Sequence, residues 1–183
     1  MPPDIGFTRY MRQLRALAVS IATLIGAFCA LPAFAQSTET EISGMPEVLD
    51  ADILKFGQQR VILWGVDAPE IRQKCWIDGV YWGCHEAAKR QLQLLSGRGE
   101  VTCTYRGEPD PFNRQYGVCT SGGDDLNAEM VRSGLALAFV EQSEDYLPEM
   151  AEAIANSVGL WQVGVLFEEP WQFRRRETPG GYR

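Results

Sequence analysis

The stretch RVILWGVDAPE, residues 60–70, is an apolar run that ends in two carboxylic acids. Residues 61–66 are almost all apolar and rich in β-formers, which is typical of a strand buried in a core. Asp67 and Pro69 then favour a turn, and Glu70 follows it. The stretch therefore predicts a core strand whose end displays two carboxylates, Asp67 and Glu70.

Apolar periodicity along the rest of the chain predicts a mixed α+β domain built on a small barrel. The expected strands lie at 47–56, 60–66, 100–105, 115–120 and 135–140. Residues 71–83 are expected to form a loop. Apolar residues at helical spacing predict three helices, at 84–95, 127–133 and 147–158.

The first 35 residues have the layout of a secretory signal peptide. Arg9, Arg12 and Arg15 precede an apolar segment at 16–31, and small residues end at Ala35, where cleavage is expected. The alternative, an uncleaved anchor, has an apolar core that is short for a membrane span. We therefore expect a periplasmic or secreted protein with no membrane span after cleavage, and with a flexible leader at 36–46, one domain at 47–173 and a disordered tail at 174–183.

The net charge is acidic. The chain has 17 basic and 24 acidic residues, a net charge of −7. The predicted signal peptide contains three of the arginines and Asp4, so the mature chain has 14 basic and 23 acidic residues, a net charge of −9. Strong non-specific nucleic-acid binders usually carry the opposite charge, because lysine and arginine displace counterions from phosphates. The composition argues against tight polyanion binding by the whole surface, but not against a local basic patch.

Four cysteines remain after the predicted cleavage. An even number of cysteines behind a signal peptide favours two disulfides, and three pairings are possible. We expect Cys103–Cys119, because both residues lie in predicted strands, and Cys75–Cys84, which would close a short loop. The alternative is a zinc site, which the lack of C-x-x-C spacing and the single histidine disfavour.

Several acids are expected to converge near the end of the core strand. Strand alternation within 47–56 places Asp50 and Asp52 on one face, and Asp52 can approach Asp67 on the paired strand. Carboxylates without a histidine or thiolate beside them suit a hard cation such as calcium. Glu70 could then orient or deprotonate a water molecule. The alternative is that these acids only cap turns, and their spacing leaves both interpretations open.

Seven short segments follow one another in a specific order: DADI (50–53), VILWGVDAPE (61–70), DPFNR (110–114), VC (118–119), DLN (125–127), MVR with GLA (130–136) and GLW (159–161). Their order and spacing resemble the staphylococcal nuclease (thermonuclease) homologues. The resemblance covers about residues 47–173. It implies a five-stranded OB-fold β-barrel with three helices, in agreement with the elements expected above.

The resemblance also implies roles for the residues that match. Asp52 and Asp67 would be calcium ligands, together with the main-chain carbonyl of Ala68. Glu70 would position or activate the attacking water, and Arg114 would contact the phosphate in the transition state. The implied activity is calcium-dependent hydrolysis of single-stranded DNA or RNA by a monomer.

One position departs from the family pattern. Ile62 stands where active members carry an arginine that clamps the phosphate, and losing one such donor costs about 3–4 kcal/mol, roughly 10²–10³ in rate. Arg60 lies two residues earlier on the same strand face, about 6.6 Å along the strand, and is a speculative replacement. The alternative is that Arg60 faces water at the end of a hairpin.

Two functions therefore stand against each other, and whether the protein is an enzyme is left open. The first is an exported calcium-dependent phosphodiesterase of reduced activity, which the retained acids and Arg114 favour. The second is a non-catalytic OB-fold binding module of the cell envelope, which Ile62 and the acidic charge favour. Secreted members of this family are sometimes linked to exopolysaccharide production, so such a module could act in that process rather than in nucleic-acid turnover.

Overall fold

Strand β4 (Gln59–Leu63) lies in the middle of the main sheet, as its apolar sequence predicts. It pairs antiparallel with β3 (Ile53–Phe56) and parallel with β9 (Gln115–Ser121). Val61 and Leu63 are fully buried in the core that these strands share. The structure, a computed structural model, describes residues 40–177, and the predicted signal peptide at 1–35 lies outside them.

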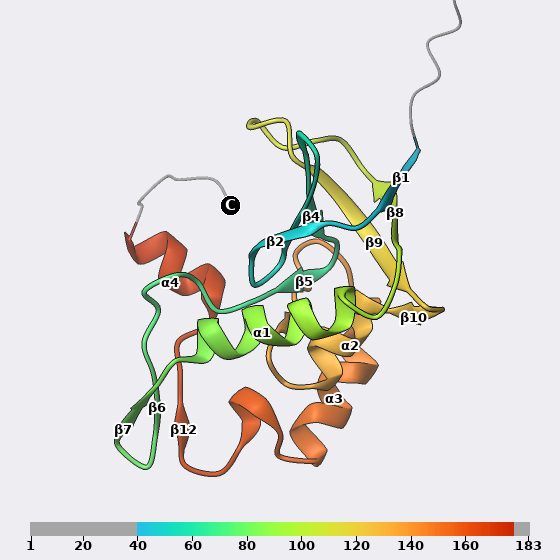
Figure 1. Ribbon diagram of the computed structural model, residues 1–183. Helices are drawn as coiled ribbons and strands as arrows, with labels where there is room; N and C mark the ends of the chain where they lie inside the picture. The colour runs from blue at the N-terminus through green and yellow to red at the C-terminus, as the bar shows by residue number, and fades with distance from the viewer. Residues whose placement is uncertain (1–39, 178–183) are drawn as a thin grey trace, which may run out of the picture. The chain divides into compact units, whose positions relative to one another are not determined.

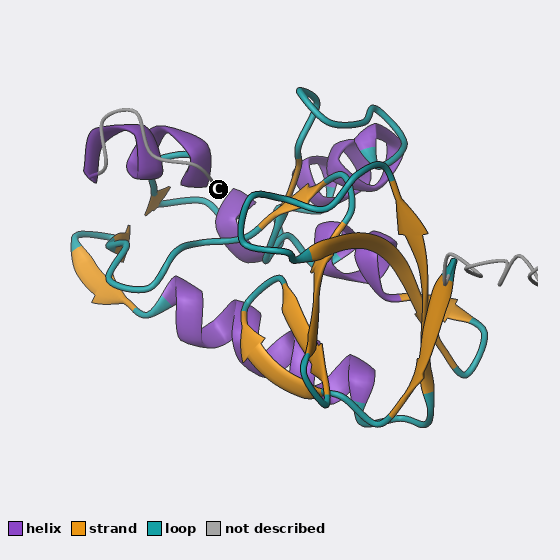
Figure 2. Ribbon diagram, turned by 90° about the horizontal axis from the view of Figure 1, so that it is seen from above, coloured by secondary structure: helices purple, strands orange, loops and turns teal. Residues whose placement is uncertain are grey.

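The sheets and helices alternate along the chain in an α+β arrangement, which confirms the predicted class (Figures 1 and 2). The main sheet has the order β1-β8-β9-β4-β3-β2, with β10 added beside β9, and two small sheets pair β5 with β11 and β6 with β7 and β12. The strand path is open at β1 and β2. In chain order the elements are β1 Glu41–Gly44, β2 Glu47–Asp50, β3 Ile53–Phe56, β4 Gln59–Leu63, β5 Val66–Asp67, β6 Cys75–Ile77, β7 Val80–Trp82, α1 Cys84–Ser96, β8 Val101–Arg106, β9 Gln115–Ser121, β10 Asp124–Asp125, α2 Leu126–Arg132, β11 Leu137–Ala138, α3 Leu147–Ala155, the 3₁₀ helix η1 Gly159–Trp161, β12 Val165–Leu166 and α4 Pro170–Glu177.

Helices α1, α2 and α3 lie close to the predicted ranges. Helix α1 buries Ala88, Leu92 and Leu95, the apolar stripe on which its prediction rested. Helix α2 begins after Asp125, whose side chain accepts a hydrogen bond of 3.0 Å from the N–H of Ala128 and so caps the helix. None of the helices in residues 40–177 is long and apolar enough to cross a membrane.

The expected strand at 47–56 is two strands. A turn at Ala51 and Asp52 separates β2 from β3, and Oδ1 of Asp50 accepts the N–H of Ala51 at 2.8 Å. Such a local side-chain bond favours a turn over a continuous strand. The alternation argument that put Asp50 and Asp52 on one face is therefore wrong. Asp50 contacts the buried His85 of α1 instead, at 2.7 Å.

Three segments expected to be irregular are ordered. Within the leader, β1 pairs with β8. The loop expected at 71–83 contains the hairpin β6–β7, whose turn is Asp78-Gly79, both at positive φ. Asp-Gly is a strong hairpin signal that the sequence already carried. Helix α4 includes residues 174–177, so the disordered tail does not begin at 174, because arginines of this helix form ion pairs with acids of the domain.

Both expected disulfides are present. Cys103 and Cys119 are cross-strand neighbours on β8 and β9 and form one bridge. Cys75 and Cys84 form the other, which joins β6 to the first residue of α1. All four cysteines are fully buried, so the bridges belong to the core.

Candidate active site

Asp67 is the last residue of β5 and is fully buried. Gly65, at a φ of +67°, makes the tight turn between β4 and β5, a conformation that glycine adopts without strain. Strand β5 then pairs with β11, where Asp67 is opposite Leu137. This pairing fixes the backbone of Asp67 and leaves a carboxylate in the interior, which requires a partner.

The partner of Asp67 is Arg174 of α4. Its Nη1 and Nη2 donate to Oδ1 and Oδ2 of Asp67, both at 2.7 Å, a bidentate ion pair. The same Nη1 donates to Oε1 of Glu70 at 2.6 Å. Burial lowers the pKa of Arg174, but the hydrogen bonds to Asp67 and Glu70 outweigh burial and raise this pKa above its usual value. One guanidinium therefore joins the two acids that the sequence places at the strand end (α4 and the segment after β5 in Figure 1).

Glu70 is held by its backbone rather than by a strand. The N–H of Glu70 donates to Oε1 of Gln73 at 3.0 Å, and the N–H of Gln73 donates back to the carbonyl of Glu70 at 2.9 Å. Nε2 of Gln73, which is 2% exposed, also donates to the carbonyl of Glu168 just before α4. Gln73 thus ties the turn of Glu70 to the chain that leads into α4.

The environment of Glu70 raises the pKa of its carboxyl group above the usual value. Burial raises the pKa of Glu70, the hydrogen bond from Arg174 lowers it, and the charges of Asp52 and Asp67 raise it again, with a net upward shift. Asp52 is thus close enough to Glu70 to act on it. Its backbone carbonyl accepts the N–H of Leu63 at 2.9 Å, which fixes the β2–β3 turn beside β4. Ala68, between the two acids, is buried in the core.

Arg114 directly precedes β9, in a loop that Asp110 organises. Oδ1 of Asp110 accepts the N–H groups of Phe112 and Arg114, and Oδ2 accepts Nε and Nη2 of Arg114, both at 2.6 Å. Burial raises the pKa of Asp110, but these hydrogen bonds outweigh burial and lower this pKa below its usual value. The guanidinium of Arg114 also lies 5.5 Å from the centre of the Phe112 ring. Asp110, in the same loop, therefore holds the guanidinium of Arg114 in place.

The two positions in doubt lie on β4. Ile62 is 1% exposed, on the strand face opposite Val61 and Leu63, and its cross-strand neighbours are Ile53 and Tyr116. Arg60 is exposed at the hairpin end of the strand, opposite Lys55. Ile62 is therefore buried and apolar at the position where the resemblance implies an arginine, and the roles of both residues stay predictions.

The comparison with known families shows which family the chain belongs to. The model of the family described as staphylococcal nuclease homologue matches residues 60–163, which is more than half of the chain. The chain belongs to this family. Its fold is accordingly the OB-fold implied by the resemblance, in the open-edged form described above.

Two curated relatives resemble this nuclease homologue. A succinoglycan biosynthesis protein, ExoI, of Rhizobium meliloti is 31% identical over 129 residues, 67% of this chain and 65% of the relative. An uncharacterized endonuclease of Haemophilus influenzae is 31% identical over 120 residues, 64% of this chain and 61% of the relative. The match thus spans slightly less than two thirds of each relative's length.

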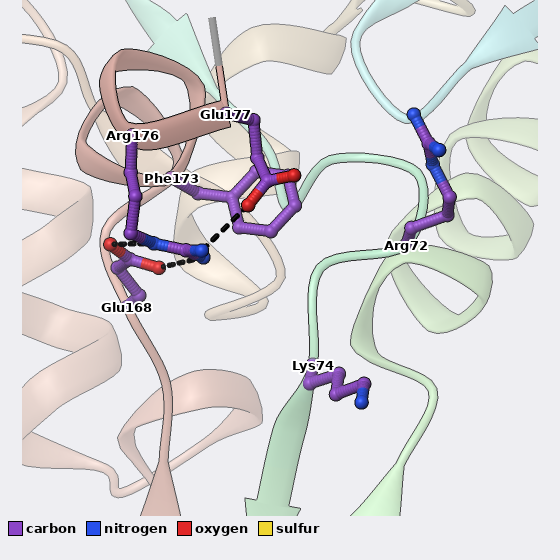
Figure 3. Close-up of a pocket in the computed structure, with 6 residues that line it drawn as sticks. All are labelled: Arg72, Lys74, Glu168, Phe173, Arg176 and Glu177. Carbon is purple, nitrogen blue, oxygen red and sulfur yellow. Dashed lines mark hydrogen bonds and ion pairs between the residues drawn. The ribbon is translucent and has the colours of Figure 1, made fainter.

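A pocket of about 340 Å³ is lined by residues of α4 and of the segments that precede α4 and follow Glu70. Arg72 and Lys74 line it from the segment after Glu70. Figure 3 shows the side chains of Arg72 and Lys74 extending away from the opposite wall, where Arg176 forms ion pairs with Glu168 and Glu177. The pocket places basic side chains a few residues from Glu70 on an otherwise acidic protein.

The carboxylate site as arranged does not fit a divalent cation. Calcium takes six to eight oxygen ligands, but both oxygens of Asp67 accept hydrogen bonds from Arg174. In residues 40–177 no group of three or more histidine, cysteine, aspartate or glutamate side chains could hold a metal ion. Sequence reasoning did not predict the ion pairs of Arg174 with Asp67 and Glu70, because the basic run 174–176 is typical of a solvated tail. The three arginines of that run were the available signal.

Proposed function

We propose that this member of the nuclease family hydrolyses phosphodiester bonds of single-stranded DNA or RNA, with reduced activity. The observation that supports the proposal is the pairing of Asp67 with Glu70 at one guanidinium, with the charge of Asp52 acting on the same site. These are the acids that the family resemblance places in the active site. The family relationship supports the nuclease class.

The residues divide the reaction between them. Glu70 takes a proton from a water molecule, whose oxygen attacks phosphorus while the bond to the leaving oxygen breaks. The leaving oxygen then takes a proton from solvent. Arg114, held by Asp110, stabilises the negative charge that grows on the phosphate oxygens. Ile62 cannot stabilise that negative charge, because its side chain is apolar, and this is why the activity is reduced. The remaining activity needs a second contact to the phosphate, from Arg60 or from another basic group beside the site.

The resemblance implies a calcium requirement, with Asp52, Asp67 and the main-chain oxygen of Ala68 as the ligands. The residues as arranged do not fit the ion, because Arg174 binds both oxygens of Asp67, so no step above depends on it. Export to the periplasm or medium through the signal peptide ending at Ala35 is supported by the two buried disulfides, because disulfides persist in oxidising compartments. We propose a monomer.

The test is a cleavage assay on heat-denatured DNA and on RNA with disulfide-intact protein, in calcium and in chelator. Glu70→Gln should lower the rate by about 10²-fold or more, because it removes the base. Glu108→Gln, an exposed glutamate in the Arg114 loop, is the matched control and should keep the wild-type rate. Equal rates in wild type and Glu70→Gln would exclude this mechanism.

A second candidate is a non-catalytic module that binds an envelope polymer such as an exopolysaccharide. It is supported by Ile62, buried where the family carries its phosphate arginine, and by the similarity to a protein named for succinoglycan biosynthesis. Binding of an acidic polysaccharide by wild type and Glu70→Gln alike, without cleavage of DNA or RNA, would favour this function.

A further inference from the structure

We propose that the small sheet β12-β6-β7 is a platform on which bases of single-stranded DNA or RNA stack, and that Arg72 and Lys74 bind phosphates between this platform and Glu70. The inference deepens the proposed function, on which it rests, because it names where the strand binds beyond the bond that is cut. The platform is defined by three exposed apolar side chains: Trp76, Tyr81 and Leu166.

The platform is one row of side chains across the three strands, which lie side by side in Figure 1. Trp76 of β6 is paired with Tyr81 of β7 on one side and with Leu166 of β12 on the other. Directly paired residues of neighbouring strands lie on the same face of a sheet. These three side chains are 39%, 54% and 68% exposed, respectively. Contiguous exposed apolar side chains of this size mark an interaction surface.

The other face of the sheet holds the platform in place. Cys75, which precedes Trp76, is fully buried and forms a disulfide with Cys84 of α1. Its strand neighbour Trp82 packs against the same buried cluster. The two aromatic rings of the platform have their centres 6.1 Å apart. Because the sheet beneath them is anchored, they are presented to a ligand at little further cost in conformational entropy.

Two cations lie between Glu70 and the platform. Exposed and buried residues alternate along 72–76, so that Arg72, Lys74 and Trp76 are exposed. Neither the Arg72 nor the Lys74 side chain forms an ion pair or hydrogen bond with another residue of the described range 40–177. On a chain with a net charge of −7, two exposed cations without an acid partner are complementary to a polyanion.

The platform is within reach of the site of cleavage. Trp76 follows Glu70 by six residues, and a chain extends at most about 3.6 Å per residue, so the two lie within about 22 Å. At a spacing of about 3.4 Å between phosphates, about six nucleotides span that distance. OB-folds bind about 4–16 nucleotides of a single strand. Aromatic rings beside cations favour such a strand, because each base offers a π-face and each phosphate a charge.

Fluorescence anisotropy with labelled oligothymidylate of about 20 nucleotides tests the platform. Every variant is made in Glu70→Gln protein, so that the strand stays intact. Trp76→Ala should bind about 5- to 150-fold more weakly than this parent, the range for loss of one base–aromatic stack. Leu94→Ala removes an apolar side chain that is 69% exposed on α1 and should bind as the parent does. Equal affinity of Trp76→Ala and the parent would overturn the proposal.

The salt dependence of the affinity separates the cations from the rings. Lys74→Gln should reduce the slope of log K against log salt by about 0.7, the value for one phosphate contact on a single strand. Trp76→Ala should leave the slope unchanged, because it removes no charge. Arg90→Gln removes an exposed cation from α1 and is the control, with the slope of the parent. A slope that Lys74→Gln does not change would contradict the phosphate contact.

Further variants cover the case in which Trp76→Ala does not fold. Tyr81→Ala should also weaken binding, whereas Trp76→Tyr keeps an aromatic ring and should retain most of the affinity. Alginate, an acidic polysaccharide, is the competing polymer. Alginate binding that is lost in Trp76→Ala, together with no binding of oligothymidylate by the parent, would overturn the proposal.

Cleavage by the same variants with Glu70 intact separates this inference from the proposed function. Trp76→Ala should raise KM and leave kcat unchanged, because the platform binds the strand away from the reacting bond. Binding of oligothymidylate that depends on Trp76, without cleavage by wild type, would overturn hydrolysis and support the platform. Cleavage by Trp76→Ala with the KM of wild type would overturn the platform and leave hydrolysis standing.

Discussion

Nε2 of His85 lies 2.7 Å from Oδ1 of Asp50, a contact that joins the first turn of α1 to the end of β2. The hydrogen bond to Asp50 raises the pKa of His85 above 6.5, with help from Glu86 and against burial and the charge of Lys89. Burial raises the pKa of Asp50, but its bonds to His85 and Ala51 outweigh burial and lower it below 3.8. The pair of protonated His85 and ionised Asp50 therefore stabilises the folded state.

The stability of the domain should fall as pH rises above 6.5. The contribution of His85 is complete below its unfolded pKa and is lost as pH rises through its folded pKa, whereas that of Asp50 is lost only as pH falls below 3.8. Urea unfolding of wild type and His85→Gln between pH 5.5 and 8.5, a range that starts below the ordinary histidine pKa of about 6.5 and extends above it, measures the loss. A stability difference between the two proteins that does not change with pH would contradict the expectation.

Asn127→Ala should be among the costliest polar substitutions. The side chain is fully buried; its Oδ1 accepts the N–H of Cys119, and its Nδ2 donates to the carbonyls of Trp64 and Gly117. Alanine leaves these backbone groups without partners, at a cost of about 2–4 kcal/mol in the free energy of unfolding. The exposed Asn156→Ala is the control, expected within about 0.5 kcal/mol of wild type.

Asp110→Asn should lower turnover through Arg114. Asparagine can still accept the N–H groups of Phe112 and Arg114 at Oδ1, but it removes the charge that holds the guanidinium. We expect kcat to fall by about 10- to 100-fold on heat-denatured DNA, as for a displaced catalytic group. An unchanged kcat, with the protein folded as judged by its urea midpoint, would show that Asp110 does not position Arg114 for the reaction.

Removal of the Cys75–Cys84 disulfide should loosen the junction of β6 and α1. The bridge spans nine residues, and the chain-entropy model assigns such a loop about 2–3 kcal/mol. Cys75→Ala combined with Cys84→Ala should lower the urea midpoint accordingly, since both residues pack in a buried cluster with Leu137 and Leu160. If the midpoint matches that of the oxidised wild type, the bridge does not contribute to stability.

Several features could be predicted because their signals are local. The apolar run at 61–66 predicts β4, the stripe at Ala88, Leu92 and Leu95 predicts α1, and cysteines in neighbouring strands predict Cys103–Cys119. The Asp-Gly hairpin of β6–β7 was also readable, although residues 71–83 were expected to be a loop. Asp52 was expected in a continuous strand but lies in a turn. The hydrogen bond from the Ala51 N–H to the Asp50 side chain favours that turn over the strand.

The sequence by itself determined the family, the α+β class, the two disulfides and the acids at the end of the core strand, because each depends on neighbouring residues or on a fixed order of motifs. The contacts of those acids depend on segments that are distant along the chain and meet only in the folded domain. Asp67 and Arg174 are 107 residues apart. Their pairing follows from the burial of a carboxylate that must be neutralised by whichever cation the folded chain brings within reach, and no local pattern records that requirement.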